Sequence, residues 1–266
     1  MSKLSRTPSL LVGTLLAGLA WTAPALAEIK WTMSGSSDCG TNCISLAGNT
    51  RSFTQGGVTL TTQAWSNTGG TAGLTTGTLE TAYLALYGGG LGVKNRDGGT
   101  TAPNTGDADE WVPPEHGIDN QGNRWDGVLA SFSSAIDLNK VEIGWMSSDS
   151  DITVLAYTGA GVPTLSGLTY SQLTSNGWTF VGHYDNLAVG TAKSVNPTNI
   201  ASAYWLITAY LPLWGDATWS ANNDHLKLLA LYGEKTTRVP EPHALLLIGV
   251  AALGLWATRK GAARPA

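Results

Sequence analysis

The middle of the chain reads WDGVLASF at residues 125–132, VEIGW at residues 141–145 and DITVLAY at residues 151–157. Each run is short and mostly apolar, and Gly, Asn, Asp or Ser residues lie at or between the runs. Short apolar runs bounded by turn-forming residues are typical of β-strands. These three runs therefore predict the centre of an all-β domain.

Runs of the same kind recur on both sides of this stretch. We predict an antiparallel two-layer sandwich of jelly-roll type, because many short strands alternate with polar turns. One short helix is expected at residues 169–173, with Thr169 as its N-cap and Asn176-Gly177 as its end. The predicted strands are Ile29–Met33, Val58–Trp65, Tyr83–Leu86, Gly127–Phe132, Val141–Trp145, Ile152–Ala156, Trp178–Tyr184, Ala203–Tyr210 and Leu226–Tyr232.

Composition supports the same fold class and excludes one class of partner. Glycine is abundant at 33 residues and charged residues make up only 13% of the chain, which suits strands joined by turns. Without Glu241, 18 of the 19 acidic residues remain between the two ends, and without the five basic residues near the ends, 10 of the 15 basic residues remain. The net charge between the ends is therefore −8. Such a surface repels polyanions, so we expect no nucleic-acid partner.

The first 27 residues predict a secretory signal peptide. Lys3 and Arg6 precede an apolar run from Leu10 to Trp21, and small residues at Ala25 and Ala27 form a cleavage site for signal peptidase before Glu28. An uncleaved anchor helix is the alternative, but it requires a longer apolar stretch. The mature domain is therefore expected to span residues 28–234.

Residues 235–266 predict a linker and a sorting tail. Val239-Pro240-Glu241-Pro242 precedes an uncharged apolar span at residues 244–257, and a basic end follows it. A helix of that length measures about 21 Å, less than the roughly 30 Å hydrocarbon core, so we expect a transmembrane helix that anchors the chain only transiently in the inner membrane. A permanent tail anchor is the alternative.

This order of motif, apolar span and basic end resembles the PEP-CTERM sorting signal. The resemblance implies that Pro240, Glu241 and Pro242 form a sorting motif, although His243 follows the motif where a small residue is commoner. It also implies that an exosortase, a membrane cysteine transpeptidase, removes the tail and that the protein reaches the cell surface or the extracellular space.

The middle of the chain carries a second resemblance. Residues 111–120 read WVPPEHGIDN and lead into the runs at 125–132, 141–145 and 148–157. This pattern resembles a group of exosortase-dependent surface proteins of Gram-negative bacteria. The resemblance implies a surface domain and no particular reaction.

The two cysteines predict a disulfide. Three residues separate Cys39 from Cys43, in a chain destined for an oxidising compartment. The bond would shape the loop after the first strand and would stabilise the fold by about 2 kcal/mol. A redox or metal pair is the alternative, but no other soft ligand lies nearby in the sequence.

Clustered acidic residues predict a calcium site. Carboxylate oxygens are the ligands that calcium prefers, and Asn120 or backbone carbonyls could complete the shell. The spacing does not match an EF-hand, so a solvated acidic loop stays the alternative. The predicted ligands are Asp107, Asp109, Asp119, Asp149 and Asp151.

The same carboxylates could in principle serve a glycoside hydrolase, which needs two carboxyl groups about 5 to 9.5 Å apart. No feature of the sequence selects such a pair, and the chain has neither a Gly-x-Ser-x-Gly turn nor a His-Glu-x-x-His helix. We therefore predict no catalytic residues and no enzymatic activity.

Tryptophans suggest a carbohydrate ligand. Most should fill the core, because the chain has only three phenylalanines. Trp214 and Trp219 lie in a loop with Gly and Asn and are the best candidates for stacking on a polysaccharide.

Three functions follow for a protein of the cell surface or biofilm matrix. A structural or adhesive role needs only export, sorting and a β domain, so it is the leading prediction. A module that binds exopolysaccharide is the alternative, and a secreted glycoside hydrolase comes third.

Overall fold

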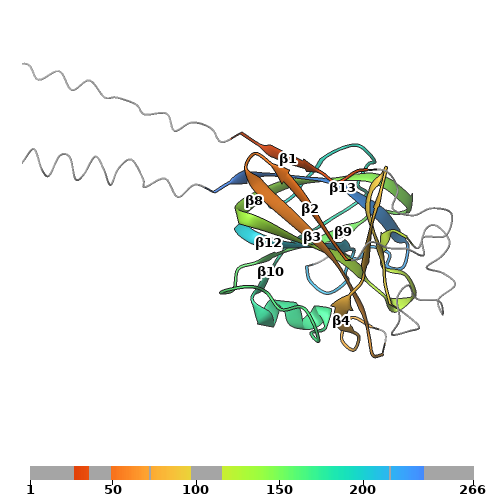
Figure 1. Ribbon diagram of the computed structural model, residues 1–266. Coiled ribbons are helices and arrows are strands. Elements are labelled where there is room, and N and C mark those ends of the chain that lie inside the picture. Colours follow the sequence, from red (N-terminus) through yellow and green to blue (C-terminus); the bar gives the residue numbers. More distant parts are fainter. Residues whose placement is uncertain (1–26, 36–48, 72, 97–115, 216, 237–266) are drawn as a thin grey trace, which may run out of the picture. The chain divides into compact units, whose positions relative to one another are not determined.

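Thirteen strands form one continuous antiparallel sheet in the computed structural model, which describes residues 27–35, 49–71, 73–96, 116–215 and 217–236 (Figure 1). The strands are β1 (Ile29–Thr32), β2 (Thr50–Gln55), β3 (Val58–Gly69), β4 (Thr78–Thr81), β5 (Tyr83–Tyr87), β6 (Gly90–Lys94), β7 (Ile118–Asp119), β8 (Asp126–Ser148), β9 (Ile152–Tyr157), β10 (Trp178–Tyr184), β11 (Lys193–Ser194), β12 (Ala201–Ala209) and β13 (Asp224–Lys235). Two short 3-10 helices, η2 (Gln121–Asn123) and η3 (Tyr170–Asn176), complete the described elements.

The predicted all-β class is confirmed, with two differences in the strands. The runs at 127–132 and 141–145 are two parts of the single 23-residue strand β8. Additional short strands also appear, among them β2, whose sequence TRSFTQ contains one apolar residue. An edge strand of this composition lacks the alternation of apolar and polar residues by which strands are recognised.

The sheet folds into the two layers of a sandwich because β8 belongs to both. In the first layer the order is β10-β9-β12-β8-β3-β2, with Leu60 opposite Phe132 and Trp205 opposite Ala130. In the second layer the later part of β8 pairs with β13, which also pairs with β1, β6 and β7.

The space between the layers is filled by apolar side chains from both of them. Trp31 of β1 and Phe132 of β8 meet edge to face at a ring-centroid distance of 4.8 Å. The Trp31 indole also donates a 3.1 Å hydrogen bond to the Val58 carbonyl. Five of the eight described tryptophans are buried, as the shortage of phenylalanine predicts: Trp31, Trp65, Trp125, Trp178 and Trp205.

A second apolar cluster covers part of the outer face of the first layer. Tyr170 and Leu173 of η3 pack there with Leu206 of β12. The predicted helix is confirmed as a 3-10 helix: the Gln172 side chain accepts a 2.9 Å hydrogen bond from the Thr169 N–H, and Gly177 ends the helix at φ 85°. This cluster leaves the β2–β3 end of the same face uncovered.

Several predicted features lie outside the described residues. They are the signal peptide up to residue 26, the disulfide between Cys39 and Cys43, and the apolar span at 244–257. Within the described residues, no helix has both the length and the apolar character needed to cross a membrane.

Trp31 gives a direct test of the core. Replacing it with alanine (Trp31→Ala) should lower the free energy of unfolding by about 3–5 kcal/mol, because a buried indole and its hydrogen bond are lost. Urea unfolding of the processed protein measures the change. The control Val162→Ala, at a side chain that is 74% exposed, should shift stability by less than about 0.5 kcal/mol.

Candidate functional site

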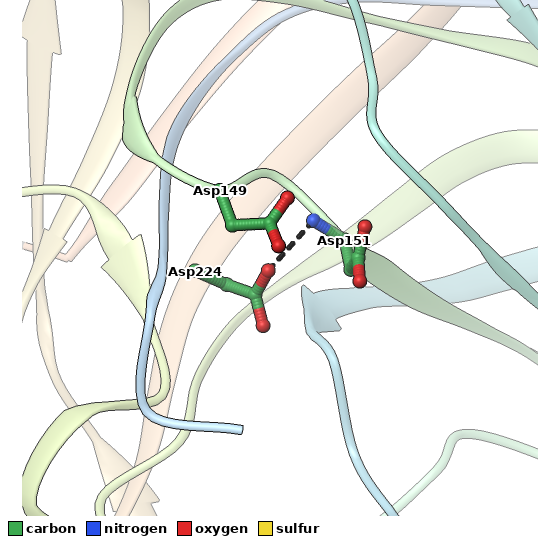
Figure 2. A group of neighbouring side chains, drawn as sticks. All are labelled: Asp149, Asp151 and Asp224. Carbon is green, nitrogen blue, oxygen red and sulfur yellow. Dashed lines mark hydrogen bonds between the residues drawn. The ribbon is translucent and has the colours of Figure 1, made fainter. Parts of the chain in front are cut away.

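Three aspartates meet where β8, β9 and β13 begin or end. Asp149 follows β8, Asp151 precedes β9 and Asp224 is the first residue of β13. One carboxylate oxygen from each lies within 4.8 Å of those from the other two (Figure 2). Ser148, at φ 61°, makes the tight reversal that brings Asp149 back beside Ser147. We call Asp149, Asp151 and Asp224 the acidic group.

Hydrogen bonds from backbone and amide groups hold the acidic group in place. The Asp151 N–H donates to Asp224 Oδ1 at 2.7 Å, and Asn120 Nδ2 donates to the other oxygen of Asp224. Asp149 accepts from the Ser150 N–H at 2.8 Å and from Asn223 Nδ2 at 3.1 Å. The carboxylates therefore have fixed positions.

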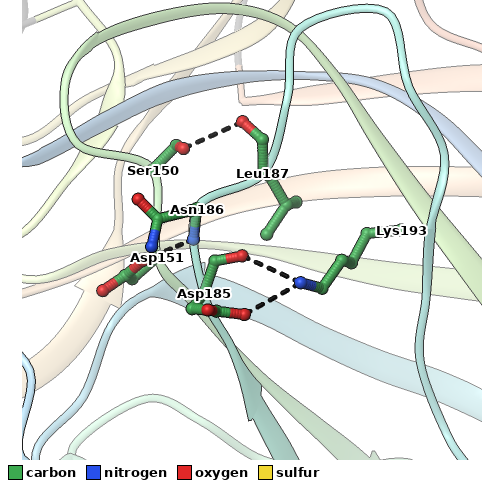
Figure 3. A network of polar contacts seen from close by, with 6 residues as sticks. All are labelled: Ser150, Asp151, Asp185, Asn186, Leu187 and Lys193. Carbon is green, nitrogen blue, oxygen red and sulfur yellow. Dashed lines mark hydrogen bonds and ion pairs between the residues drawn. The ribbon is translucent and has the colours of Figure 1, made fainter.

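The connection between β10 and β11 contacts the acidic group at Asp151 and the neighbouring Ser150. The Asn186 N–H donates to Asp151 Oδ1 at 2.7 Å, and the Ser150 hydroxyl donates to the Leu187 carbonyl at 2.9 Å (Figure 3). Lys193 donates instead to the Asp185 carboxylate at 2.8 Å. None of the ion pairs formed among the described residues includes a member of the acidic group.

Burial sets the electrostatics of the acidic group. Asp224 is 0% exposed and Asp151 is 3% exposed. Burial raises the pKa of Asp224 to about 7, and the neighbouring charges of Asp151 and Asp149 also raise it. Burial likewise raises the pKa of Asp151, although the hydrogen bond from Asn186 opposes that shift. Like charges this close need either protons or a cation between them.

The chemistry of these side chains fits a hard divalent cation. Calcium takes six to eight oxygen ligands from carboxylates, amide or backbone carbonyls and water. Carboxylates from three different strand ends meet here and supply oxygen ligands. Asn120 and Asn223 turn their Nδ2 groups toward these carboxylates, so the two amides hold the carboxylates in place and are not ligands in this arrangement. The acidic group therefore contains the types of ligand that such an ion requires.

Sequence reasoning identified part of this group. The structure brings the predicted ligands Asp149 and Asp151 together. Asp119 is buried on β7, opposite His225, and lies outside the group; Asp107 and Asp109 lie outside the described residues. Asp224 was not among the predicted ligands, because it is 73 positions from Asp151 and comes close only through the pairing of β13 with β8.

Aromatic side chains gather beside β10 and the connection from β12 to β13. The predicted carbohydrate-binding residues Trp214 and Trp219 are both partly buried there. Trp214 lies 5.9 Å from Phe180 and Trp219 lies 5.3 Å from Tyr210, measured between ring centroids. The two tryptophans therefore belong to one aromatic group and keep part of their surface accessible.

His183 links this aromatic group to β9 through hydrogen bonds at both of its ring nitrogens. Its Nδ1 lies 2.9 Å from the Thr153 hydroxyl, and its Nε2 bonds to the Trp214 carbonyl. Burial lowers the pKa of His183. A neutral imidazole that donates from Nε2 and accepts at Nδ1 satisfies both contacts, so His183 acts as a structural link to the Trp214 loop.

The uncovered end of the first layer carries a patch of hydroxyl groups. Because Val58, Leu60 and Phe132 point into the core, their strand neighbours face outward. Ser52 and Thr61 lie 3.2 Å apart, and Thr54 and Thr59 lie 3.0 Å apart, measured between hydroxyl oxygens. We define the hydroxyl face by six residues of β2, β3 and β8: Ser52, Thr54, Thr59, Thr61, Ser131 and Ser133.

Comparison with known proteins identifies the tail. The family described as the PEP-CTERM protein-sorting motif matches residues 238–260, which include Pro240, Glu241 and Pro242. The chain therefore carries a PEP-CTERM sorting motif, and this motif implies an exported surface protein that an exosortase processes. No curated protein and no solved structure matches the chain.

The acidic group predicts that stability depends on pH. The folded-state pKa of Asp224, about 7, lies above the ordinary aspartate value, so the folded protein holds a proton that the unfolded chain releases between about pH 4 and 7. In calcium-free buffer, the free energy of unfolding should therefore fall by about 1 kcal/mol per pH unit as the pH rises through this window.

The slope should be much flatter in Asp224→Asn, which titrates no proton at this position. Urea unfolding at several pH values measures it. The control Asp185→Asn should keep the wild-type slope in this window, because Lys193 lowers the pKa of Asp185. A wild-type slope of zero between pH 4 and 7 would contradict the assignment.

Proposed function

We propose that the exported domain is a non-enzymatic adhesive or structural component of the extracellular matrix. The observation that carries this proposal is the hydroxyl face, whose six residues are exposed or partly exposed, whereas η3 packs against Leu206 on the same side of the sheet. A surface of hydroxyl groups offers both donors and acceptors to a polymer that is itself rich in hydroxyl groups.

The charge of this surface indicates the type of polymer. None of its six residues is ionisable, and the chain between its two ends carries a net charge of −8. A polyanion would be repelled by that net charge. The favoured ligand is therefore a neutral exopolysaccharide.

The register of the strands aligns hydroxyl groups in a row across the sheet. Ser52, Thr61 and Ser131 lie in register on three neighbouring strands, and Tyr204 of β12 continues the row opposite Ser131. Neighbouring strands are about 4.8 Å apart, so the row extends for roughly 14 Å across the sheet. An aromatic ring at the end of a row of hydroxyls suits a sugar chain, which presents hydroxyl groups and apolar ring faces.

Binding by the hydroxyl face is tested by removing hydroxyls while keeping the shapes of the side chains. The combined variant Thr59→Val and Thr61→Val should reduce sedimentation with exopolysaccharide from the native matrix by about 5- to 10-fold, since about two hydrogen bonds are lost. The matched control Thr50→Val lies at the other end of β2 and should bind normally. Equal binding by all three proteins would contradict the proposal.

A second candidate function is carbohydrate binding by the aromatic group, which the partial exposure of Trp214 and Trp219 favours. The same assay separates the two. If the aromatic group binds the polymer, Trp214→Ala and Trp219→Ala should each weaken binding about 2- to 10-fold, and Thr59→Val with Thr61→Val should have no effect.

The catalytic alternative receives less support from the described residues. The carboxylates that meet in the acidic group include two that are almost fully buried, Asp151 and Asp224. A glycoside hydrolase needs two carboxyl groups that face a bound sugar. We therefore retain the non-enzymatic proposal.

We also propose that the acidic group binds calcium as a structural ion. Asp149 and Asp151 keep the role predicted from the sequence, and Asp224 joins them. Extracellular calcium modules bind with a Kd of about 10⁻⁴ M, so about 10 mM calcium should stabilise the fold by about 2.7 kcal/mol.

Thermal unfolding in calcium and in chelator tests this metal site. The Tm should rise by several degrees with calcium, and Asp151→Asn should abolish the rise. Asp185→Asn changes a neighbouring carboxylate outside the group, and this control should keep the rise. A Tm that is the same in calcium and in chelator would exclude the site.

A further inference from the structure

The strand that leads to the sorting motif is held by hydrogen bonds up to its last described residues. Gly233 pairs with Ile29 of β1, and Lys235 pairs with Ile136 of β8. Beyond the strand, the N–H and the hydroxyl of Thr236 both donate to the Ala135 carbonyl at 3.3 Å. The backbone is therefore fixed as far as Thr236.

Only three residues separate this fixed point from Pro240, where the sorting motif begins: Thr237, Arg238 and Val239. A fully extended chain spans at most 3.3–3.6 Å per residue, so Pro240 lies within roughly 14 Å of Thr236 whatever the linker's conformation. An enzyme that binds the motif must therefore work very close to the folded domain.

Small residues form part of the surface around this exit. We call it the sorting end and define it by the β2–β3 turn at Gly56-Gly57, the bend of β8 at Ser133-Ser134-Ala135, and Lys235. The five residues of the turn and the bend are exposed, and neither they nor Thr236 has a bulky side chain.

The β2–β3 turn lies beside the strand that leads to the tail. A Cβ atom added at Gly57 would lie 3.6 Å from the Lys235 ammonium nitrogen, and one added at Gly56 would lie 2.9 Å from the Ile29 side chain. Both glycines have positive φ values, 55° and 69°, which a two-residue hairpin turn requires. Any group placed on this turn would therefore stand next to the exit of the tail.

We propose that the sorting end is the surface that contacts the exosortase, and that the enzyme takes the tail while the domain is folded. The short linker demands close approach, and the small side chains permit it. This inference rests on the sorting motif, the short linker and the small side chains, and it does not depend on which ligand the domain binds at the cell surface. The alternative is that β13 detaches from β1 and β8 before cleavage, which would make the shape of the sorting end irrelevant.

Two insertions test the proposal in the native cells. A compact domain of about 60 residues is inserted between Gly56 and Gly57 at the sorting end, or between the exposed residues Gly70 and Thr71 at the other end of β3, roughly 37 Å away along the strand. Pulse–chase labelling with intact-mass analysis follows the loss of residues beyond about Pro242. The first insertion should slow tail removal at least tenfold, and the second should leave it near the wild-type rate.

A spacer separates steric blocking from misfolding. Twelve Gly and Ser residues inserted after Thr236 add an r.m.s. reach of roughly 19 Å, and they should restore tail removal in the Gly56–Gly57 insertion variant. Ser134→Trp provides the same test with a single side chain and should also slow removal until the spacer is added. Normal processing of both sorting-end variants, equal slowing by the two insertions, or slowing that the spacer does not relieve would overturn the proposal.

Discussion

The pairing of β8 with strands in both layers is the interaction on which the rest of the structure depends. Its first part pairs with β3 and β12, and its later part pairs with β13 and β11. A strand of 23 residues can serve two layers only if it bends, and the exposed residues at 133–135 mark that bend. The position of each functional feature follows from this strand: the acidic group lies at its C-terminal end, and the exit of the tail lies at its bend.

The acidic group illustrates how a fold can concentrate like charges. Asp149 and Asp151 are close in sequence, but Asp224 arrives because β13 pairs with the end of β8. Backbone N–H groups stabilise the ionised carboxylates, whereas burial favours their protonated forms. The balance between these effects makes the protonation of the group sensitive to pH, and the calcium ion proposed above would compete with those protons.

The sequence was most informative where a single strand or turn carries the signal. Apolar runs located most of the long strands, and Thr169 with Asn176-Gly177 marked the helix. The single strand at 126–148 was read as two, because Ser133, Ser134 and Asn139 resemble a turn when the sheet that pairs with them is unknown. The hydroxyl face and Asp224 depend on pairing between distant segments, which one sequence does not reveal.

The second apolar cluster gives the first layer an uneven distribution of local stability. Leu155 of β9 and Leu206 of β12 are covered by η3 on the outside, while Val154 and Ile207 of the same strands are covered by the main core. Strands that are buried on both faces open only with the whole domain, whereas the exposed edge at β2 can fray alone. Amide hydrogen exchange should accordingly be slowest in β9 and β12 and fastest in β2, so the surface available to a ligand is also the part of the sheet with the greatest freedom to adjust to it.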